Sequence, residues 1–129
     1  MSTDTDLISA LITDGYFNGA FNDLDTAAME RAFHREFAIF STDGEALARY
    51  PIGTWIGAIE QRKAAAGFDP KSARRACRIV QLDVTGNAAS AKIEIDRDGA
   101  RLYTDYLSLL RFADGWKIVA KVYVDHSAG

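Results

Sequence analysis

The feature that most limits the fold of this chain is the run of residues 74–125, in which apolar and polar residues alternate. The run contains four extended segments separated by short turns with glycine. These turns are Thr85-Gly86-Asn87, Asp98-Gly99 and Asp114-Gly115. Loops this short, with glycine available where the backbone needs a positive φ, join antiparallel neighbours. The run therefore predicts a four-stranded antiparallel meander.

The first half of the chain is predicted to be mainly helical. From Asp6 to Phe33, apolar residues recur at spacings of three and four, as in an amphipathic helix. The first apolar stripe consists of Leu7, Ile8, Leu11, Ile12, Tyr16 and Ala20. Residues 22–25 interrupt the pattern and offer caps for a second helix, which carries Met29, Ala32 and Phe33 on its buried side.

Between these helices and the meander, the sequence predicts a hairpin and one more helix. Residues 37–50 alternate around Asp43-Gly44, a strong hairpin signal. Pro51 marks the start of a helix that carries Trp55 and ends near Gly67. Helices followed by a meander indicate an α+β fold with the helices on one face of the sheet. We expect one domain over residues 1–129.

Composition excludes several functions. The net charge of −3 provides no basic surface for nucleic acid or anionic lipid. No apolar run approaches the length of a membrane span, and the acidic N-terminus does not resemble a signal peptide. One cysteine excludes an internal disulfide, so we expect a cytoplasmic protein. Two histidines far apart and no glycine-rich phosphate loop predict neither a metal nor a cofactor.

The order of elements and several motifs resemble the NTF2-like superfamily, which has a cone-shaped, cystatin-like α+β fold. The segments "YFNG", "AFH", "YTDYLSLL" and "GWKIVAKVY" are similar to its SnoaL-like, or putative lumazine-binding, group. The resemblance covers essentially the whole chain. It implies N-terminal helices packed on a curved, mostly antiparallel sheet, with a ligand cavity between them. Because this superfamily contains enzymes, ligand binders and assembly modules, the resemblance does not choose among these functions.

A comparison with ketosteroid isomerase, a distant member of the superfamily, singles out two residues. Tyr16 matches the tyrosine and Asp105 matches the protonated acid of that enzyme's oxyanion hole. Its carboxylate base has no counterpart, since Ser41 and Thr42 lie near that place. Without a base, proton abstraction loses its first step, so steroid isomerisation by that mechanism is not expected.

Alternation divides the last predicted hairpin into two faces. One face holds Leu102, Thr104, Tyr106, Ser108, Leu110, Phe112, Trp116, Ile118, Ala120, Val122 and Val124. The other holds Tyr103, Asp105, Leu107, Leu109, Arg111, Lys117, Val119, Lys121 and Tyr123. The turn brings Asp105 near Lys121 and Tyr123, either as an exposed ion pair worth under ~1 kcal/mol or inside a pocket. The resemblance implies that the Asp105 face meets the helices, which leaves the first face for a second subunit in a homodimer.

Other residues have two interpretations each. His34 is either an acid or base at the pocket mouth or a histidine at a helix end. Trp55 either lines the pocket or belongs to the core, and Arg78 either meets solvent or holds an anion. His126 lies in a tail that we expect to be disordered. The residues assigned to ligand contact are Phe33, Trp55, Arg78, Tyr103, Lys121 and Tyr123.

The function predicted first is binding of a small apolar or aromatic molecule in a conical hydrophobic cavity. Acid–base chemistry of an isomerase, cyclase or dehydratase type would use Asp105 and Tyr16 as donors and His34 as the proton carrier. A binding module without turnover and a dimerisation or partner-binding domain are the alternatives, so catalysis stays open. We also expect burial to raise the pKa of Asp105 unless the Lys121 ammonium comes within reach.

Overall fold

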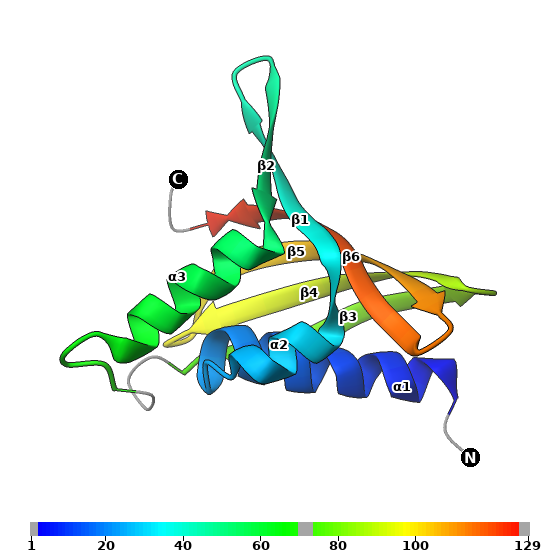
Figure 1. The fold of residues 1–129 in the computed structure, drawn as a ribbon, viewed down its shortest axis with the longest axis horizontal. Coiled ribbons are helices and arrows are strands. Elements are labelled where there is room, and N and C mark those ends of the chain that lie inside the picture. The colour runs from blue at the N-terminus through cyan, green and yellow to red at the C-terminus, as the bar shows by residue number, and fades with distance from the viewer. Residues whose placement is uncertain (1–2, 70–73, 127–129) are drawn as a thin grey trace.

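The computed structural model describes residues 3–69 and 74–126. Its helices lie along one face of a curved six-stranded sheet (Figure 1). The helices are α1 (Asp4–Leu11), the π-helix η1 (Ile12–Asn22), α2 (Thr26–Ala32) and α3 (Ile52–Ala64). The strands are β1 (Phe33–Asp43), β2 (Ala46–Pro51), β3 (Ala76–Thr85), β4 (Ala88–Arg97), β5 (Ala100–Phe112) and β6 (Gly115–Asp125).

The sheet order is β2-β1-β6-β5-β4-β3. Strands β3 to β6 form the predicted antiparallel meander, and β1 and β2 form the predicted hairpin, with Gly44 at a φ of 61°. The two parts join because β1 pairs with β6 in parallel. The sheet is therefore mixed but mostly antiparallel, which confirms the expected α+β fold.

The start of α2 follows the cap predicted from the sequence. Asp25 caps α2 by accepting a hydrogen bond from the backbone N–H of Ala28. Phe33, predicted on the buried side of that helix, is instead the first residue of β1. Leu7, predicted in the buried stripe of the first helix, is 49% exposed. Leu7 points to solvent because the buried side of this helix is formed by Ile8 and, in the π-helix that follows, Ile12.

The π-helix η1 packs closely on α2. A Cβ atom added at Gly15 would lie 2.2 Å from Cβ of Ala32, so only glycine allows this approach. The backbone N–H of Asp23 donates to the carbonyl of Asn18, closing an i→i+5 turn. This close packing fixes the position of Tyr16 relative to the sheet. Tyr16 lies in η1 and is fully buried.

A β-bulge near Val119 changes which side chains of β6 face the helices. The register passes from Leu109↔Ile118 to Ser108↔Ala120, so β6 holds one extra residue. Trp116 and Ile118 consequently point into the core, with 4% and 0% exposure. The prediction that these two residues belong to the uncovered face is wrong, because strict alternation does not hold across a bulge.

Outside the bulge, the two faces of the sheet are as predicted. Asp105, Leu107 and Leu109 are buried beneath the helices. On the opposite face, called the outer face, the last hairpin leaves five large apolar side chains exposed: Tyr106, Leu110, Phe112, Val122 and Val124. Within residues 3–69 and 74–126, no helix has the length and apolar character needed to cross a membrane.

Candidate functional site

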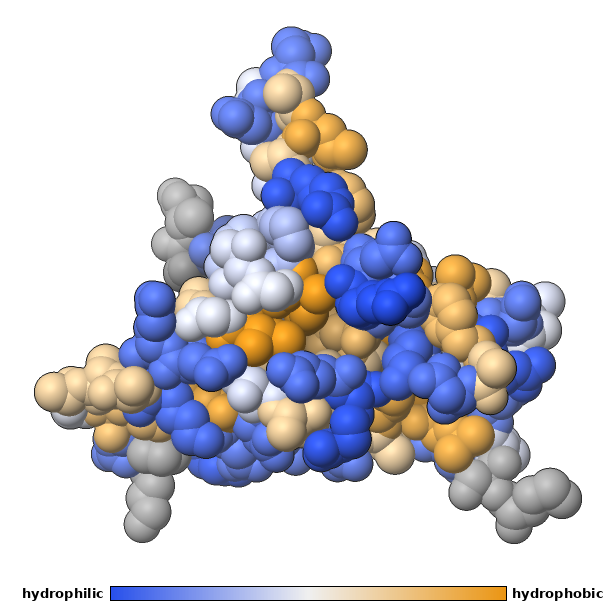
Figure 2. All heavy atoms as spheres, in the orientation of Figure 1, coloured by the Kyte–Doolittle hydropathy of each residue, from blue (hydrophilic) through white to orange (hydrophobic). Residues whose placement is uncertain are grey.

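A pocket of about 530 Å³ opens between the β1–β2 hairpin, α3 and the ends of β5 and β6. This volume is within the usual range for small-molecule sites. The hairpin extends beyond the body of the molecule, with hydrophobic residues along one side (Figure 2). The pocket is lined by Phe21, Ile39, Ser41, Ala48, Arg49, Tyr50, Trp55, Tyr103, Lys121 and Tyr123.

Lys121 lines the pocket although its residue is only 5% exposed. Aromatic rings surround its ammonium group. Nζ lies 4.8 Å from the ring centroid of Tyr16, 4.9 Å from that of Trp55 and 4.8 Å from that of Tyr123. Each ring face attracts a cation, so this aromatic cage compensates part of the hydration that the ammonium loses on burial.

Asp105 and Tyr16 lie beneath Lys121, in a layer that does not line the pocket. Both residues are 0% exposed. The Tyr16 hydroxyl donates a hydrogen bond to Oδ2 of Asp105, and the same oxygen lies 4.0 Å from Nζ of Lys121. Oδ1 of Asp105 is buried and has no hydrogen-bond partner within the described part of the chain. The three residues form a buried polar triad with one unused acceptor.

Burial changes the acidity of all three residues in this triad. It raises the pKa of Asp105, while the Lys121 ammonium and the Tyr16 hydrogen bond act in the opposite direction. Burial also lowers the pKa of Lys121 to about 8, against the attraction of Asp105. The pKa of Tyr16 is well above its ordinary value, first because of burial and then because of the Asp105 charge. The pKa values of Asp105 and Lys121 thus move toward each other, which makes proton exchange between them easier.

The prediction that the Asp105 side of the last hairpin faces the helices is confirmed. Asp105 pairs directly with Tyr123 across the two strands, and Lys121 pairs with Leu107. Tyr16, expected as a donor to a ligand, instead donates its hydroxyl hydrogen bond to Asp105 below the pocket floor. Lys121 is therefore the member of the triad that lines the pocket.

His34, expected at the pocket mouth, does not line the pocket. Its ring stacks on Phe112, with 4.8 Å between the centroids, and Nδ1 accepts a hydrogen bond from the backbone N–H of Glu36. Phe33 is buried in the core against Trp55, and it does not line the pocket either. Both positions follow from strand β1, where neighbouring residues point to opposite faces.

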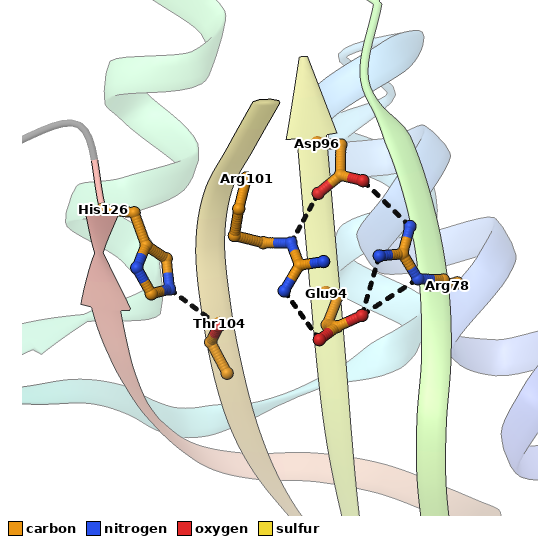
Figure 3. A network of polar contacts seen from close by, with 6 residues as sticks. All are labelled: Arg78, Glu94, Asp96, Arg101, Thr104 and His126. Atoms are coloured by element: carbon orange, nitrogen blue, oxygen red, sulfur yellow. Dashed lines mark hydrogen bonds and ion pairs between the residues drawn. The ribbon is translucent and has the colours of Figure 1, made fainter. Parts of the chain in front are cut away.

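Arg78 lies on the outer face of the sheet and not in the pocket. Its neighbours Cys77 and Ile79 pack against the core, so alternation turns Arg78 outward. Its guanidinium binds Glu94 and Asp96, with N···O distances of 2.7 and 3.0 Å (Figure 3). Arg78 therefore contacts this network and does not line the pocket, contrary to its assignment as a ligand-binding residue.

His126 was expected to lie in a disordered tail. Its Nε2 atom is 2.8 Å from the Thr104 hydroxyl oxygen (Figure 3). This contact follows from the antiparallel pairing of Thr104 with Val124, which carries the end of β6 along β5.

Four of the residues assigned to ligand contact do line the pocket: Trp55, Tyr103, Lys121 and Tyr123. Sequence reasoning did not assign Phe21 or the hairpin residues Ile39, Ala48, Arg49 and Tyr50, and placed Ser41 only near the missing base. The hairpin itself was predicted, and its alternation placed Ile39 and Ser41 on one side. Its position over the pocket depends on the pairing of β1 with β6, for which the sequence has no local signal.

The described residues contain no group of three or more His, Cys, Asp or Glu side chains placed to hold a metal ion. Cys77 is half-buried in β3, and burial raises its pKa to about 11, so its thiol stays protonated. The polar side chains that line the pocket are Lys121, Arg49 and the hydroxyl-bearing Ser41, Tyr50, Tyr103 and Tyr123.

Comparisons with known proteins agree with this architecture. The family described as "Putative lumazine-binding" matches residues 3–124. An NTF2-like protein of unknown function from Shewanella baltica is 28% identical, with 98% of each chain covered and a TM-score of 0.75. Another from Silicibacter pomeroyi is 26% identical, with 98% of this chain and 100% of that chain covered and a TM-score of 0.72. No curated protein matches the chain.

A more distant structure shows the same fold. An uncharacterised protein with a cystatin-like fold from Caulobacter vibrioides is 18% identical, with 97% of this chain and 92% of that chain covered and a TM-score of 0.62.

Proposed function

Because the chain belongs to the "Putative lumazine-binding" family and has an NTF2-like fold, we propose that it binds a small aromatic molecule carrying an anionic group. The observation that carries this proposal is the make-up of the pocket. Among the described residues that line it, Lys121 and Arg49 are cationic and none is acidic. Aromatic rings from Phe21, Trp55 and Tyr103 supply flat apolar walls.

The two cations occupy different depths, which orients the ligand. Lys121 is almost fully buried, whereas Arg49 is exposed on β2 at the rim. A ring held between the aromatic walls would place one polar group near Nζ of Lys121 and another near the Arg49 guanidinium. Because Asp105 already compensates Lys121, Arg49 is the cation that an anionic ligand would neutralise.

Calorimetric titration tests this proposal with matched ligand pairs. We expect 2-naphthoate to bind more tightly than 2-naphthalenemethanol, which has the same ring without the charge. Arg49→Gln should weaken naphthoate binding by up to about fivefold, as expected for an exposed ion pair, and leave the alcohol unaffected. Arg97→Gln, which changes an exposed arginine outside the pocket, is the control. Equal affinities for acid and alcohol in all three proteins would contradict an anionic ligand.

A second candidate function is acid–base catalysis, favoured by the Lys121–Asp105 pair at the pocket floor. Lys121 replaces His34 as the proposed proton carrier, because among the described residues it alone combines a polar atom in the pocket with a buried proton partner. Deuterium exchange at the methyl group of an aromatic ketone such as acetophenone, followed by NMR, tests this role. We expect Lys121→Met to abolish the exchange and Lys92→Met, on the outer face, to retain it. Equal exchange in both variants would contradict the role.

We also propose that the protein forms a homodimer through the outer face. The exposed side chains of Tyr106, Leu110, Val122 and Val124 form an apolar area on neighbouring strands β5 and β6. Such an area in a small domain is typical of an interface. Light scattering should give twice the mass of the 14.1 kDa chain, and Val122→Glu should return the monomer mass. A wild-type protein that scatters as a monomer at micromolar concentration would contradict the dimer.

A further inference from the structure

We propose that the Lys121 amine forms an imine with an aldehyde or ketone carbonyl of a ligand bound in the pocket. The proposal rests on the proposed binding function and adds a covalent step to it. The ligand would be an aromatic aldehyde or ketone that also carries the anionic group recognised at the rim.

The position of Lys121 makes its amine the one that a pocket ligand would meet. Among the described lysines, Lys121 alone lines the pocket. The amine of Lys117 donates a hydrogen bond to the Arg31 carbonyl at 2.8 Å, and that of Lys92 lies over the Tyr106 ring on the outer face. A ligand carbonyl that reaches the pocket floor therefore approaches Nζ of Lys121 and no other described amine.

The surroundings of Lys121 supply the neutral amine that attack on a carbonyl requires. An apolar site activates a lysine nucleophile by disfavouring its charged form. Burial lowers the pKa of Lys121 to about 8, so the loss of water outweighs the attraction of the ammonium to the surrounding rings and to Asp105. At pH 7 this leaves roughly a tenth of the amine neutral, against less than roughly one part in a thousand for an ordinary lysine.

Asp105 is placed to move the protons of this reaction. The Nζ lone pair forms a bond to the carbonyl carbon, and the carbonyl electron pair moves to oxygen, which takes up one of the two amine protons. Nitrogen then releases a proton to the Asp105 carboxylate, whose Oδ2 lies 4.0 Å away and whose Oδ1 has no partner in the described chain. Return of that proton to the hydroxyl group lets it leave as water while nitrogen forms the C=N bond. The sum is amine plus carbonyl giving imine plus water, without oxidant or reductant.

Reductive trapping tests the imine with 4-carboxybenzaldehyde as the probe, since it combines an aromatic ring, a carboxylate and an aldehyde. The probe is added to the full chain with cyanoborohydride, and the modified lysine is identified by peptide mass mapping. We expect one adduct on Lys121, heavier by the probe minus one oxygen, formed at least tenfold faster than on Lys92. The compound 4-methylbenzoate, which lacks the carbonyl, should compete and slow this labelling. Lys121→Arg should lose the adduct and Lys92→Arg should retain it.

The wild-type mapping decides the question even if Lys121→Arg does not fold. Labelling spread evenly over the lysines would overturn the imine proposal. Quenching of tryptophan fluorescence by the probe without an adduct on Lys121 would overturn the imine and leave the binding function standing. Absence of both quenching and adduct would contradict both proposals.

Discussion

Two charged clusters lie on opposite faces of the same sheet and behave in opposite ways. On the inner face, Asp105 and Lys121 are buried beneath the helices. Burial raises the pKa of Asp105 and lowers that of Lys121, which favours the uncharged form of each. On the outer face, hydrogen bonds from Arg101 and Arg78 lower the pKa of Asp96 and favour its charged form. The pKa values of Asp105 and Asp96 therefore shift in opposite directions, because Asp105 has lost water whereas Asp96 gains hydrogen bonds from two arginines.

The difference extends to how completely each cluster is paired. The outer network joins Arg78, Glu94, Asp96 and Arg101 by several ion pairs, so each carboxylate has two arginine partners (Figure 3). The inner pair is separated by 4.0 Å and leaves Oδ1 of Asp105 without a partner in the described chain. A satisfied, partly exposed network supports structure, whereas an incompletely satisfied buried pair is typical of a site that handles a ligand.

The largest expected effect comes from removing the inner carboxylate. Asp105→Ala leaves the Lys121 ammonium without its anion and the Tyr16 hydroxyl without its acceptor. We expect the free energy of unfolding to fall by about 3–5 kcal/mol, measured by urea denaturation. Asp96→Ala on the outer face is the matched control and should cost far less. Similar losses for the two variants would contradict the contrast between the faces.

The second prediction uses pH to show the cost of burying Lys121. Its pKa is about 8 in the folded chain, below the ~10.4 of a free lysine, so between these values the unfolded chain binds more protons. The cost is fully present below pH 8 and is relieved as pH rises through this window. Comparison with Lys121→Met cancels the contributions of groups that both proteins share. From pH 7 to 10, wild type should gain about 2 kcal/mol relative to this variant. A constant difference would show that the pKa of Lys121 is not lowered.

The third prediction concerns the hydrogen bond between Tyr16 and Asp105. Tyr16→Phe keeps the buried ring and removes only the donor. We expect a loss of about 1.5–3 kcal/mol in the free energy of unfolding, as for a hydrogen bond to a charged group. The pKa of Asp105, followed by carboxyl-carbon NMR, should rise further, because this hydrogen bond holds it down. An unchanged titration midpoint would mean that Tyr16 serves only packing.

The smallest effect is expected on the outer face. Arg78→Ala removes two ion pairs of a side chain that is 47% exposed. The expected loss in the free energy of unfolding is far smaller than that of Asp105→Ala, and it should shrink further in high salt. Thermal unfolding at two salt concentrations measures it. A loss as large as that of Asp105→Ala would show that exposure does not separate the two clusters.

The sequence predicted the local structure of this chain well because turns and caps act over a few residues. Asp43-Gly44, Asp98-Gly99 and Asp114-Gly115 each form the expected turn between adjacent strands. Within the last hairpin, the sequence predicted the approach of Asp105 to Tyr123 and Lys121, but the register that pairs Asp105 with Tyr123 is reached only across the bulge. Features that depend on the next few residues were therefore predictable.

The sequence predicted less where one residue interrupts a pattern. The bulge near Val119 turns Trp116 and Ile118 inward, and no turn residue marks it. Alternation alone also could not decide on which face the helices pack, so the inward position of Asp105 was expected from the resemblance. Arg78 was assigned to the pocket from its charge, while the core contacts of Cys77 and Ile79 turn it outward.

By itself the sequence determined the elements, their turns and the residues that share a strand face, because backbone propensities and short loops act locally. The tertiary structure alone decided that β1 pairs with β6, which brings Arg49 and the hairpin over the pocket. It also decided that Tyr16 meets Asp105, a contact between residues 89 positions apart. Such contacts form only when the whole apolar core closes, because the loss of water that alters Asp105 and Lys121 requires helices and sheet together.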